Sequence, residues 1–197
     1  MRGKWLIFAA GMAAGGWILA GAPGTASESE APASTPQAFL DFCAREPAEC
    51  ESQLAAKPLR MNAARWLTAQ TINSQVNAEV RAADDSTLFQ EPEHWAVAGK
   101  AGDCEDYVLL KRRLLRQAGF PDAALLITIV RDERNEGHAV LTLATPEGDF
   151  ILDNRRDRML SPAATGYRFI KRQSTSDPMR WVSLADSQTP EVASTRN

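Results

Sequence analysis

The chain has 197 residues, a formal net charge of -3 at pH 7 and 44% hydrophobic residues. A chain of this length can bury one sizeable core. The weakly acidic balance, with no basic run after the N-terminal segment, argues against nucleic-acid binding.

Residues 1–26 have the layout of a secretory signal peptide. Basic side chains precede an apolar run over residues 5 to about 20, and small residues then allow cleavage after Ala26. The run is shorter than the roughly 20 apolar residues that span a bilayer, and it is rich in glycine and alanine. We therefore favour a cleaved signal over an uncleaved anchor, and we expect an exported protein.

Small polar residues and prolines fill the segments at 27–36 and 184–197. This composition is typical of a flexible linker and a disordered tail. Residues 37–183 between them are enough for one domain and too few for two.

The chain has three cysteines, an odd number for an exported protein. Cys43 and Cys50 lie close enough in the sequence to close a small loop across the end of a helix, and an oxidising compartment permits a disulfide there. Whether the two are bonded stays open at this point. If they are, Cys104 is left as an unpaired thiol, which must be buried or used.

The first half of the chain shows helical periodicity. Apolar residues recur at helical spacing over 37–46 and 51–83, and Pro58 suits the first turn of a new helix. Residues 84–103 show no period and predict a long loop, a kind of segment that often carries function.

A further helix is predicted from the sequence GDCEDY at 102–107 to Ala118. Acidic residues at its start and basic residues farther along complement the helix dipole. The side chains expected to face inward are Val108, Leu110, Leu114, Leu115 and Ala118.

Short β-branched or apolar runs separated by turn sequences follow this helix. They predict strands at 124–130, 138–145, 150–154, 167–173 and 180–184, the last as a sheet edge. Helices first and antiparallel strands second predict an α+β domain, with the Cys104 helix packed on the sheet.

Cys104, His138 and Asp153 form a candidate nucleophile, base and orienting acid. His138 begins one strand and Asp153 ends the next, so in a hairpin both lie at the same end of the sheet. Each also has an ordinary interpretation: a small core residue, a satisfied polar group at a strand end, and a strand exit into a turn. Their order in an exported chain favours catalysis.

The expected hairpin register raises one difficulty. A tight turn that pairs Thr145 with Phe150 places Asp153 opposite Thr142, on the same face as His138 but farther along the strand. A bulge, a looser loop or a strand twist must close this gap.

Three separated motifs resemble the bacterial transglutaminase-like cysteine proteinases, which include the LapG-type periplasmic proteases. They are GDCEDYVLLKRRLLRQAGFP, GHAVLTLATPEGDFILDN and GYRFIKRQ, and the similarity covers nearly all of residues 37–182. The resemblance implies a papain-like, transglutaminase-like fold with Cys104 as nucleophile, His138 as general base and Asp153 as the orienting residue.

The resemblance also implies a periplasmic, calcium-dependent endopeptidase. Such proteases cleave a large cell-surface adhesin near its N-terminus, at a paired-alanine site, and so control biofilm attachment. An inner-membrane receptor of cyclic di-GMP sequesters them. Two alternatives stay open: a transglutaminase-type acyl transferase with the same triad, and a non-catalytic periplasmic binding module.

The family binds calcium through acids that flank the nucleophile, which here implies Asp103, Glu105 and Asp106. Calcium takes several oxygen ligands, and a bound dication turns acids that oppose a thiolate into ligands that favour it. The alternative is that these acids only complement the helix dipole.

The remaining site residues are assigned from the sequence around the triad. Trp95 matches an upstream tryptophan that supplies an oxyanion donor in related transglutaminases; alternatively, it packs the loop. His94 is assigned to the surface and Asn154 to a turn. The loop sequence LFQEPEHW at 88–95 departs from the family pattern, so substrate or receptor contacts there are expected to differ.

Overall fold

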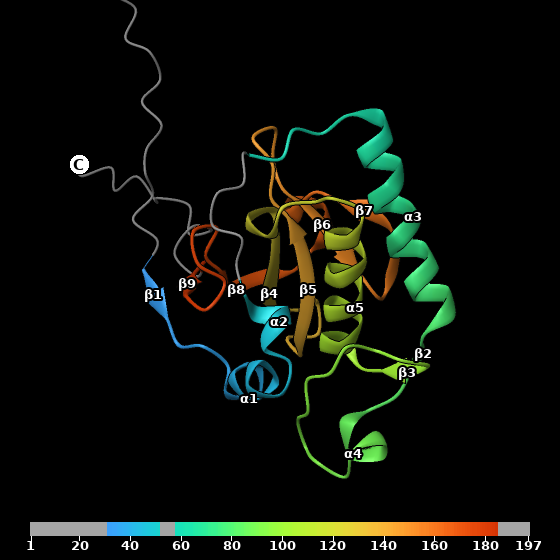
Figure 1. The fold of residues 1–197 in the computed structure, drawn as a ribbon, viewed down its shortest axis with the longest axis vertical. Helices are drawn as coiled ribbons and strands as arrows, with labels where there is room; N and C mark the ends of the chain where they lie inside the picture. Colours follow the sequence, from blue (N-terminus) through green and yellow to red (C-terminus); the bar gives the residue numbers. More distant parts are fainter. Residues whose placement is uncertain (1–30, 52–57, 185–197) are drawn as a thin grey trace, which may run out of the picture.

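The computed structural model describes residues 31–51 and 58–184 (Figure 1). The expected signal peptide, residues 52–57 of the expected second helix and residues 185–197 lie outside the described residues. The described chain combines helices with a large antiparallel sheet, which confirms the predicted α+β class. No helix in these ranges is long and apolar enough to cross a membrane.

A seven-stranded sheet forms the centre of the domain, with strand order β1-β9-β8-β4-β5-β6-β7. All of its neighbouring strands are antiparallel. Its strands are β1 (Pro32–Ala33), β4 (Leu125–Arg131), β5 (Gly137–Leu143), β6 (Phe150–Asp153), β7 (Arg156–Leu160), β8 (Arg168–Gln173) and β9 (Trp181–Ser183). A separate parallel pair joins β2 (Arg81–Ala82) to β3 (Ala101–Gly102).

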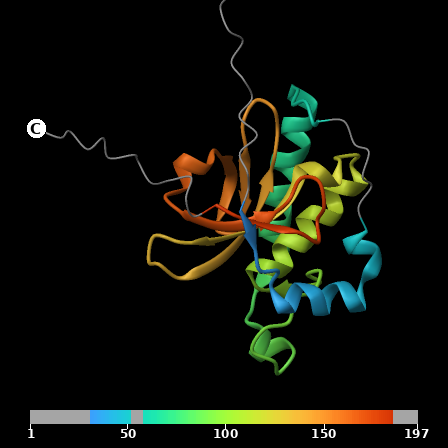
Figure 2. The same ribbon diagram turned by 90° about the vertical axis from the view of Figure 1, so that its left-hand side faces the viewer.

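The longer helices cover one face of the sheet, as Figure 2 shows. They are α1 (Gln37–Arg45), α3 (Ala63–Glu79) and α5 (Cys104–Gln117). The shorter elements are α2 (Pro47–Cys50), α4 (Asp85–Leu88), a 3-10 turn (Asp122–Ala124) and α6 (Pro162–Thr165). The segment with α4 and β3 lies at the end of the molecule from which α5 starts (Figure 1).

Alternation along β5 divides the core between the two faces of the sheet. Ala139 and Leu141 pack in the main core beneath the helices, together with Leu109 of α5. Val140 belongs to a smaller cluster on the opposite face, with Val130, Ile151, Tyr167 and Phe169. His138 shares the parity of Val140, so the sheet directs it toward the smaller cluster.

Several boundaries differ from the sequence prediction. Residues 32–33 of the expected linker pair with β9, so β1 and not β9 is the sheet edge. Helix α3 begins only at Ala63, where Asn62 caps it by accepting a hydrogen bond from the Arg65 N–H. The expected long loop contains α4, and β7 was not predicted because its alternation is weak.

Helix α5 buries two basic side chains that were expected to serve only the helix dipole. Lys111 and Arg112 are almost fully buried, whereas Ala118 is exposed. Arg112 Nη1 donates to the Glu49 carbonyl at 2.6 Å, and its Nη2 lies 3.6 Å from the Asp122 carboxylate. Packing against α2 and the sheet therefore overrides the simple apolar pattern of the helix.

The β5–β6 register corrects the expected hairpin. Phe150 pairs with Leu143 and not with Thr145, because residues 144–149 form a longer loop with Gly148 at a φ of 124°. Continuing this register sets Asp153 level with Val140, closer to His138 than the predicted Thr142. The looser loop, which was one of the ways foreseen to close the gap, shortens the distance along the strand.

Candidate active site

The N-terminus of α5 is shaped by a close backbone contact. Gly102 packs so tightly on the Asp106 side chain that a Cβ at position 102 would lie 2.6 Å from the Asp106 Cβ. Asp103 then takes the N-cap position in an extended conformation, and its carbonyl accepts the first helical hydrogen bond, from Tyr107. Cys104 is thus the first helical residue, where backbone N–H groups are left without helical partners.

The Cys104 thiol is hydrogen-bonded to the side chain of the next residue. Its Sγ donates to Glu105 Oε2 at 2.8 Å, and the backbone N–H of Ala139 also faces it. Burial, and then the Glu105 charge, raise the pKa of the thiol well above its ordinary value. Burial also raises the pKa of Glu105, to about 8. Burial and the Glu105 charge both favour the protonated thiol over the thiolate.

His138 and Asp153 form a buried pair. The His138 Nε2 lies 2.9 Å from Asp153 Oδ1, and both side chains are at most 2% exposed. Burial on its own raises the pKa of Asp153, but hydrogen bonds from His138, from the Tyr167 hydroxyl and from the Arg155 N–H bring it down to about 2. A carboxylate that stays ionised keeps the proton of a neutral His138 on Nε2.

The other ring nitrogen of His138 is the one available for proton transfer. Nδ1 is buried and has no hydrogen-bond partner within the described ranges. The thiol of Cys104 lies against Ala139, the next residue of β5, but in the described structure it is bonded to Glu105 and not to the imidazole. The thiol therefore contacts the residue that follows His138 along β5, and its hydrogen bond is directed to Glu105.

A cluster of three aspartates lies beside the nucleophile. Asp85, Asp103 and Asp106 each offer a carboxylate oxygen, and these atoms all lie within 4.8 Å of one another. Each residue also has a buried oxygen without a partner among the described residues: Asp85 Oδ1, Asp103 Oδ1 and Asp106 Oδ2. Three unsatisfied hard oxygen ligands converging on one point suit a cation such as Ca²⁺.

The pKa values of Asp103 and Asp106 are raised, first by burial and then by the neighbouring negative charges. Burial, and then the nearby charge of Asp85, raise the pKa of Asp103 to about 6. Burial raises the pKa of Asp106 to about 7, with the Asp103 and Asp85 charges adding to it. A bound dication would relieve both effects.

Among the acids predicted to hold a metal, Asp103 and Asp106 lie in the cluster, whereas Glu105 borders it. Glu105 accepts the thiol hydrogen bond and shares a side-chain hydrogen bond with Asp103. The residue that the sequence did not indicate is Asp85. It belongs to the short helix α4 in the expected loop, and it is fixed there by a hydrogen bond from the His94 backbone N–H.

Trp95 is buried inside the loop that precedes α5. Its indole N–H donates to Glu93 Oε1 at 2.7 Å, and its ring packs edge-on against Phe39 with centroids 5.7 Å apart. Arg45 donates to the Trp95 carbonyl at 2.8 Å. The indole N–H is therefore engaged by Glu93 in this structure, and the packing interpretation describes the residue as it stands.

The two other assigned residues lie near the site without joining the triad. His94 is half-buried, and its ring stacks on Phe89 at 4.2 Å between centroids. Asn154 lies in the turn between β6 and β7. Tyr167, which the sequence did not single out, contacts both His138 and Asp153; it stands within the GYRFIKRQ motif, directly before β8.

The structure joins Cys43 and Cys50 in a disulfide, with an S–S distance of 2.00 Å, and leaves Cys104 as the free thiol. The bridge spans α1 and α2, next to Glu49, whose carboxylate pairs with Arg113 at 2.8 Å and Arg116 at 3.3 Å. It therefore fastens the N-terminal helices where they contact α5.

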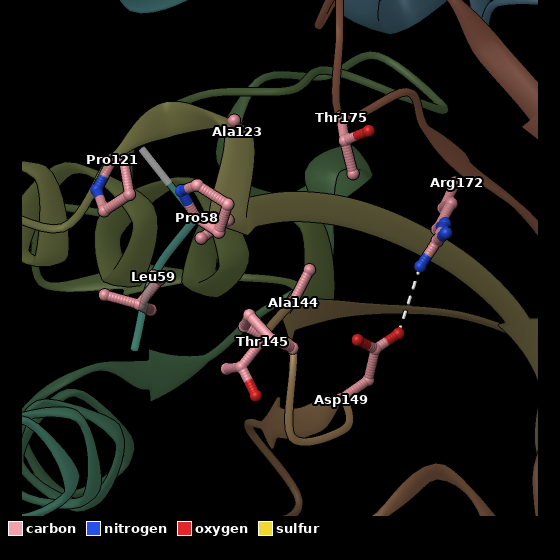
Figure 3. Close-up of a pocket in the computed structure, with 11 residues that line it drawn as sticks. Pro58, Leu59, Pro121, Ala123, Ala144, Thr145, Asp149, Arg172 and Thr175 are labelled. Atoms are coloured by element: carbon pink, nitrogen blue, oxygen red, sulfur yellow. Dashed lines mark hydrogen bonds and ion pairs between the residues drawn. The ribbon is translucent and has the colours of Figure 1, made fainter. Parts of the chain in front are cut away.

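A cavity of about 450 Å³ lies at the other end of the sheet from the triad. It is lined by Leu59, Ala124, Thr145 and the ion pair between Asp149 and Arg172, among others (Figure 3). Ala124 precedes β4 and Thr145 follows β5, which is the sheet end opposite His138. This cavity is therefore separate from the Cys104 chemistry.

Comparisons with known proteins identify a family and several solved structures of similar fold. A family model described as bacterial transglutaminase-like cysteine proteinase matches residues 29–189. No curated protein matches the chain significantly.

Solved structures of Legionella pneumophila LapG are similar in fold. An EGTA-treated form has a TM-score of 0.53 at 21% identity, covering 79% of this chain and 82% of that one. A second LapG structure has a TM-score of 0.52 at 23% identity, covering 78% and 84%. A calcium-bound form has a TM-score of 0.51 at 20% identity, covering 83% and 88%. These likenesses support the expected transglutaminase-like fold.

Proposed function

Because the chain belongs to the bacterial transglutaminase-like cysteine proteinase family, we propose that it is a calcium-dependent cysteine endopeptidase with Cys104, His138 and Asp153 as its triad. The observation that carries this proposal is the buried pair of His138 and Asp153. The pair holds Nε2 at 2.9 Å from the carboxylate and leaves Nδ1 without a partner among the described residues. The next residue along β5, Ala139, faces the Cys104 thiol.

The mechanism follows from these positions. The Cys104 thiol leaves Glu105 and transfers its proton to His138 Nδ1, and the ionised Asp153 stabilises the imidazolium. The thiolate attacks the scissile carbonyl, and His138 returns the proton to the departing amine. His138 then deprotonates water, which hydrolyses the acyl-enzyme.

The negative charge that develops on the substrate oxygen needs hydrogen-bond donors. The backbone N–H of Cys104 lies at the start of α5, where the helix dipole is positive and no helical carbonyl accepts it. The indole of Trp95 can join it only after leaving Glu93, because that carboxylate accepts its N–H at 2.7 Å. We therefore assign the main-chain N–H as the first donor.

We propose that Asp85, Asp103 and Asp106 hold the calcium ion, with Glu105 at its border. Their unpaired buried oxygens and converging carboxylates fit this ion. When bound, it supplies positive charge that offsets the acids around the thiol. The calcium-bound and EGTA-treated LapG structures add support by analogy of fold.

The substrate, location and partner are proposed from the family resemblance. They are the N-terminal region of a large cell-surface adhesin, the periplasm after signal-peptide cleavage, and an inner-membrane cyclic di-GMP receptor. Cleavage of the adhesin would release it and so control biofilm attachment.

The test uses a recombinant fragment from the N-terminal region of a repeat-containing surface adhesin of the same organism, one that carries a paired-alanine site. We expect cleavage with Ca²⁺, none with chelator, and none by the Cys104→Ala protein. Cleavage by Cys104→Ala would refute the mechanism. Adding a labelled amine separates hydrolysis from acyl transfer, because a transferase would leave the amine on a product detectable by mass spectrometry.

A further inference from the structure

Tyr167 lies directly before β8 and contacts two members of the candidate triad, although β8 carries none of them. It stands between Gly166, which has a φ of 76°, and the start of β8. It is 5% exposed and packs in the smaller core cluster with Val140 and Ile151. By strand alternation His138 and Asp153 face the same side of the sheet as these two residues.

Tyr167 contacts both members of the buried pair. Its hydroxyl donates to Asp153 Oδ2 at 2.6 Å. Its ring meets the His138 ring edge-on, with centroids 5.7 Å apart and an interplanar angle of 82°. One side chain thus restrains the carboxylate by a hydrogen bond and the imidazole by packing.

The hydroxyl completes the set of donors around Asp153. Oδ1 accepts from His138 Nε2 at 2.9 Å and from the Arg155 N–H at 3.0 Å, while Oδ2 accepts from Tyr167. Because donors occupy both oxygens, rotation of the carboxylate breaks at least one charge-assisted bond. Burial, and then the bond to Asp153, raise the pKa of Tyr167 to about 12, so it remains a donor at neutral pH.

Tyr167 is itself held in place from two sides. The Arg156 guanidinium lies over its ring, with Cζ 5.3 Å from the centroid. Arg156 also donates to the Thr165 carbonyl at 3.1 Å, and the Tyr167 N–H donates to the Thr165 hydroxyl at 3.1 Å. The tyrosine therefore has little freedom to leave Asp153.

We propose that Tyr167 is a positioning residue of the triad, which fixes the Asp153 carboxylate and the His138 ring so that the imidazole proton stays on Nε2 and Nδ1 is presented as the base. This inference rests on the proposed function, because it takes His138 as the base. The inference can be tested without the substrate.

The test reads the His138 tautomer directly. The chain has only two histidines, so ¹⁵N-histidine NMR resolves both rings, and a His94→Gln protein assigns them. Spectra are taken in a Cys104→Ala background, where no thiol exchanges a proton with the ring, at a pH where both histidines are neutral. We expect the Nε2–H tautomer alone with Tyr167, and a mixture with Nδ1–H in Tyr167→Phe.

A matched control is the other tyrosine of the chain. Tyr107 is also buried, and its hydroxyl donates to the Val80 carbonyl, away from the triad. Tyr107→Phe should leave the His138 tautomer unchanged. A folded Tyr167→Phe protein whose His138 remains entirely Nε2–H overturns the proposal.

A second readout separates this inference from the proposed function. With Cys104 restored, Tyr167→Phe should slow alkylation of the thiol by iodoacetamide about tenfold relative to Tyr107→Phe, the scale of one hydrogen bond to a charged group. A wild-type thiol that reacts no faster than in denatured protein, with Ca²⁺ present, contradicts the proposed function, while the tautomer spectrum still decides the role of Tyr167.

Should Tyr167→Phe fail to fold, Arg156→Gln replaces it. Arg156 is partly exposed, with 33% of its side chain accessible; its guanidinium lies over the Tyr167 ring, and its Nε lies 3.9 Å from Asp153 Oδ2. Appearance of the Nδ1–H tautomer in this variant, where wild type shows Nε2–H alone, supports the proposal, and an unchanged spectrum overturns it.

Discussion

Asp85 of α4 and Asp106 of α5 place carboxylate oxygens within 4.8 Å of each other, with Asp103 completing the group. Asp85 accepts a hydrogen bond from the His94 backbone N–H, and Asp106 accepts one from the Ala96 N–H at 2.7 Å. The segment before Cys104 therefore folds back onto the start of α5, and the three carboxylates gather next to Cys104.

The first prediction is that Ca²⁺ stabilises the folded protein through this cluster. An ion bound only by the folded state at a hundredfold excess of free ion over its Kd adds about 2.7 kcal/mol to the free energy of unfolding. Asp85→Asn should remove most of this gain, because it takes one negative ligand from the group. Thermal unfolding with Ca²⁺ and with chelator measures it.

Asp84→Asn is the matched control for Asp85. Asp84 is the adjacent acid, at the start of α4, and it is not among the three converging carboxylates. Its variant should keep the calcium-dependent rise in Tm. An equal rise in Asp85→Asn would exclude that residue as a ligand.

The second prediction concerns Gly102. A methyl group there would lie 2.6 Å from the Asp106 Cβ and 2.7 Å from its Oδ2, so Gly102→Ala must displace Asp106. We expect a loss of about 1–3 kcal/mol in stability, as overpacking usually costs, and weaker calcium binding by calorimetry. Gly99→Ala, which meets nothing within 4 Å, should change stability by no more than about 0.5 kcal/mol. Equal effects of the two variants would contradict the close contact.

Local sequence patterns were enough to predict the helix at Cys104, most of the strands and the α+β class. Their signals are short-range: helical periodicity, acids at a helix start, and β-branched runs between turns. The hairpin placed His138 and Asp153 at one end of the sheet, although the loop between their strands was predicted two residues too tight.

Long-range packing decided what the sequence could not predict. Asp85 joins the acid cluster only because its loop folds back onto α5, and Tyr167 reaches Asp153 only because β8 pairs with β4. Neither contact leaves a periodic pattern in the sequence. Lys111 was predicted only as one of the basic residues that complement the helix dipole, yet its side chain is fully buried, which is rare for lysine.

The third prediction tests the disulfide. Loop-closure entropy for cysteines separated by 7 residues corresponds to about 2–3 kcal/mol of stability. The Cys43→Ser, Cys50→Ser double variant should lose this amount in urea unfolding. In wild-type protein, a thiol assay on the denatured chain should count one reactive thiol before reduction and three after it, because only Cys104 is free. Three thiols before reduction would contradict the bond.

The last prediction concerns Lys111, whose buried Nζ has no hydrogen-bond partner among the described residues. Burial lowers its pKa from 10.5 to about 7, although the charges of Asp153 and Asp157 oppose this. Between these two pH values the unfolded chain binds a proton that the folded chain does not, so stability should rise with pH, by at most about 1.4 kcal/mol per pH unit. The raised pKa values of Glu105 and Cys104 act in the opposite direction in this range, so the contribution of Lys111 is read as a difference between slopes. In urea unfolding between pH 7.5 and 9.5, the free energy of unfolding of wild type and of Lys100→Met, an exposed control, should increase with pH relative to that of Lys111→Met. Equal slopes in all three proteins would show that Lys111 keeps its proton when folded.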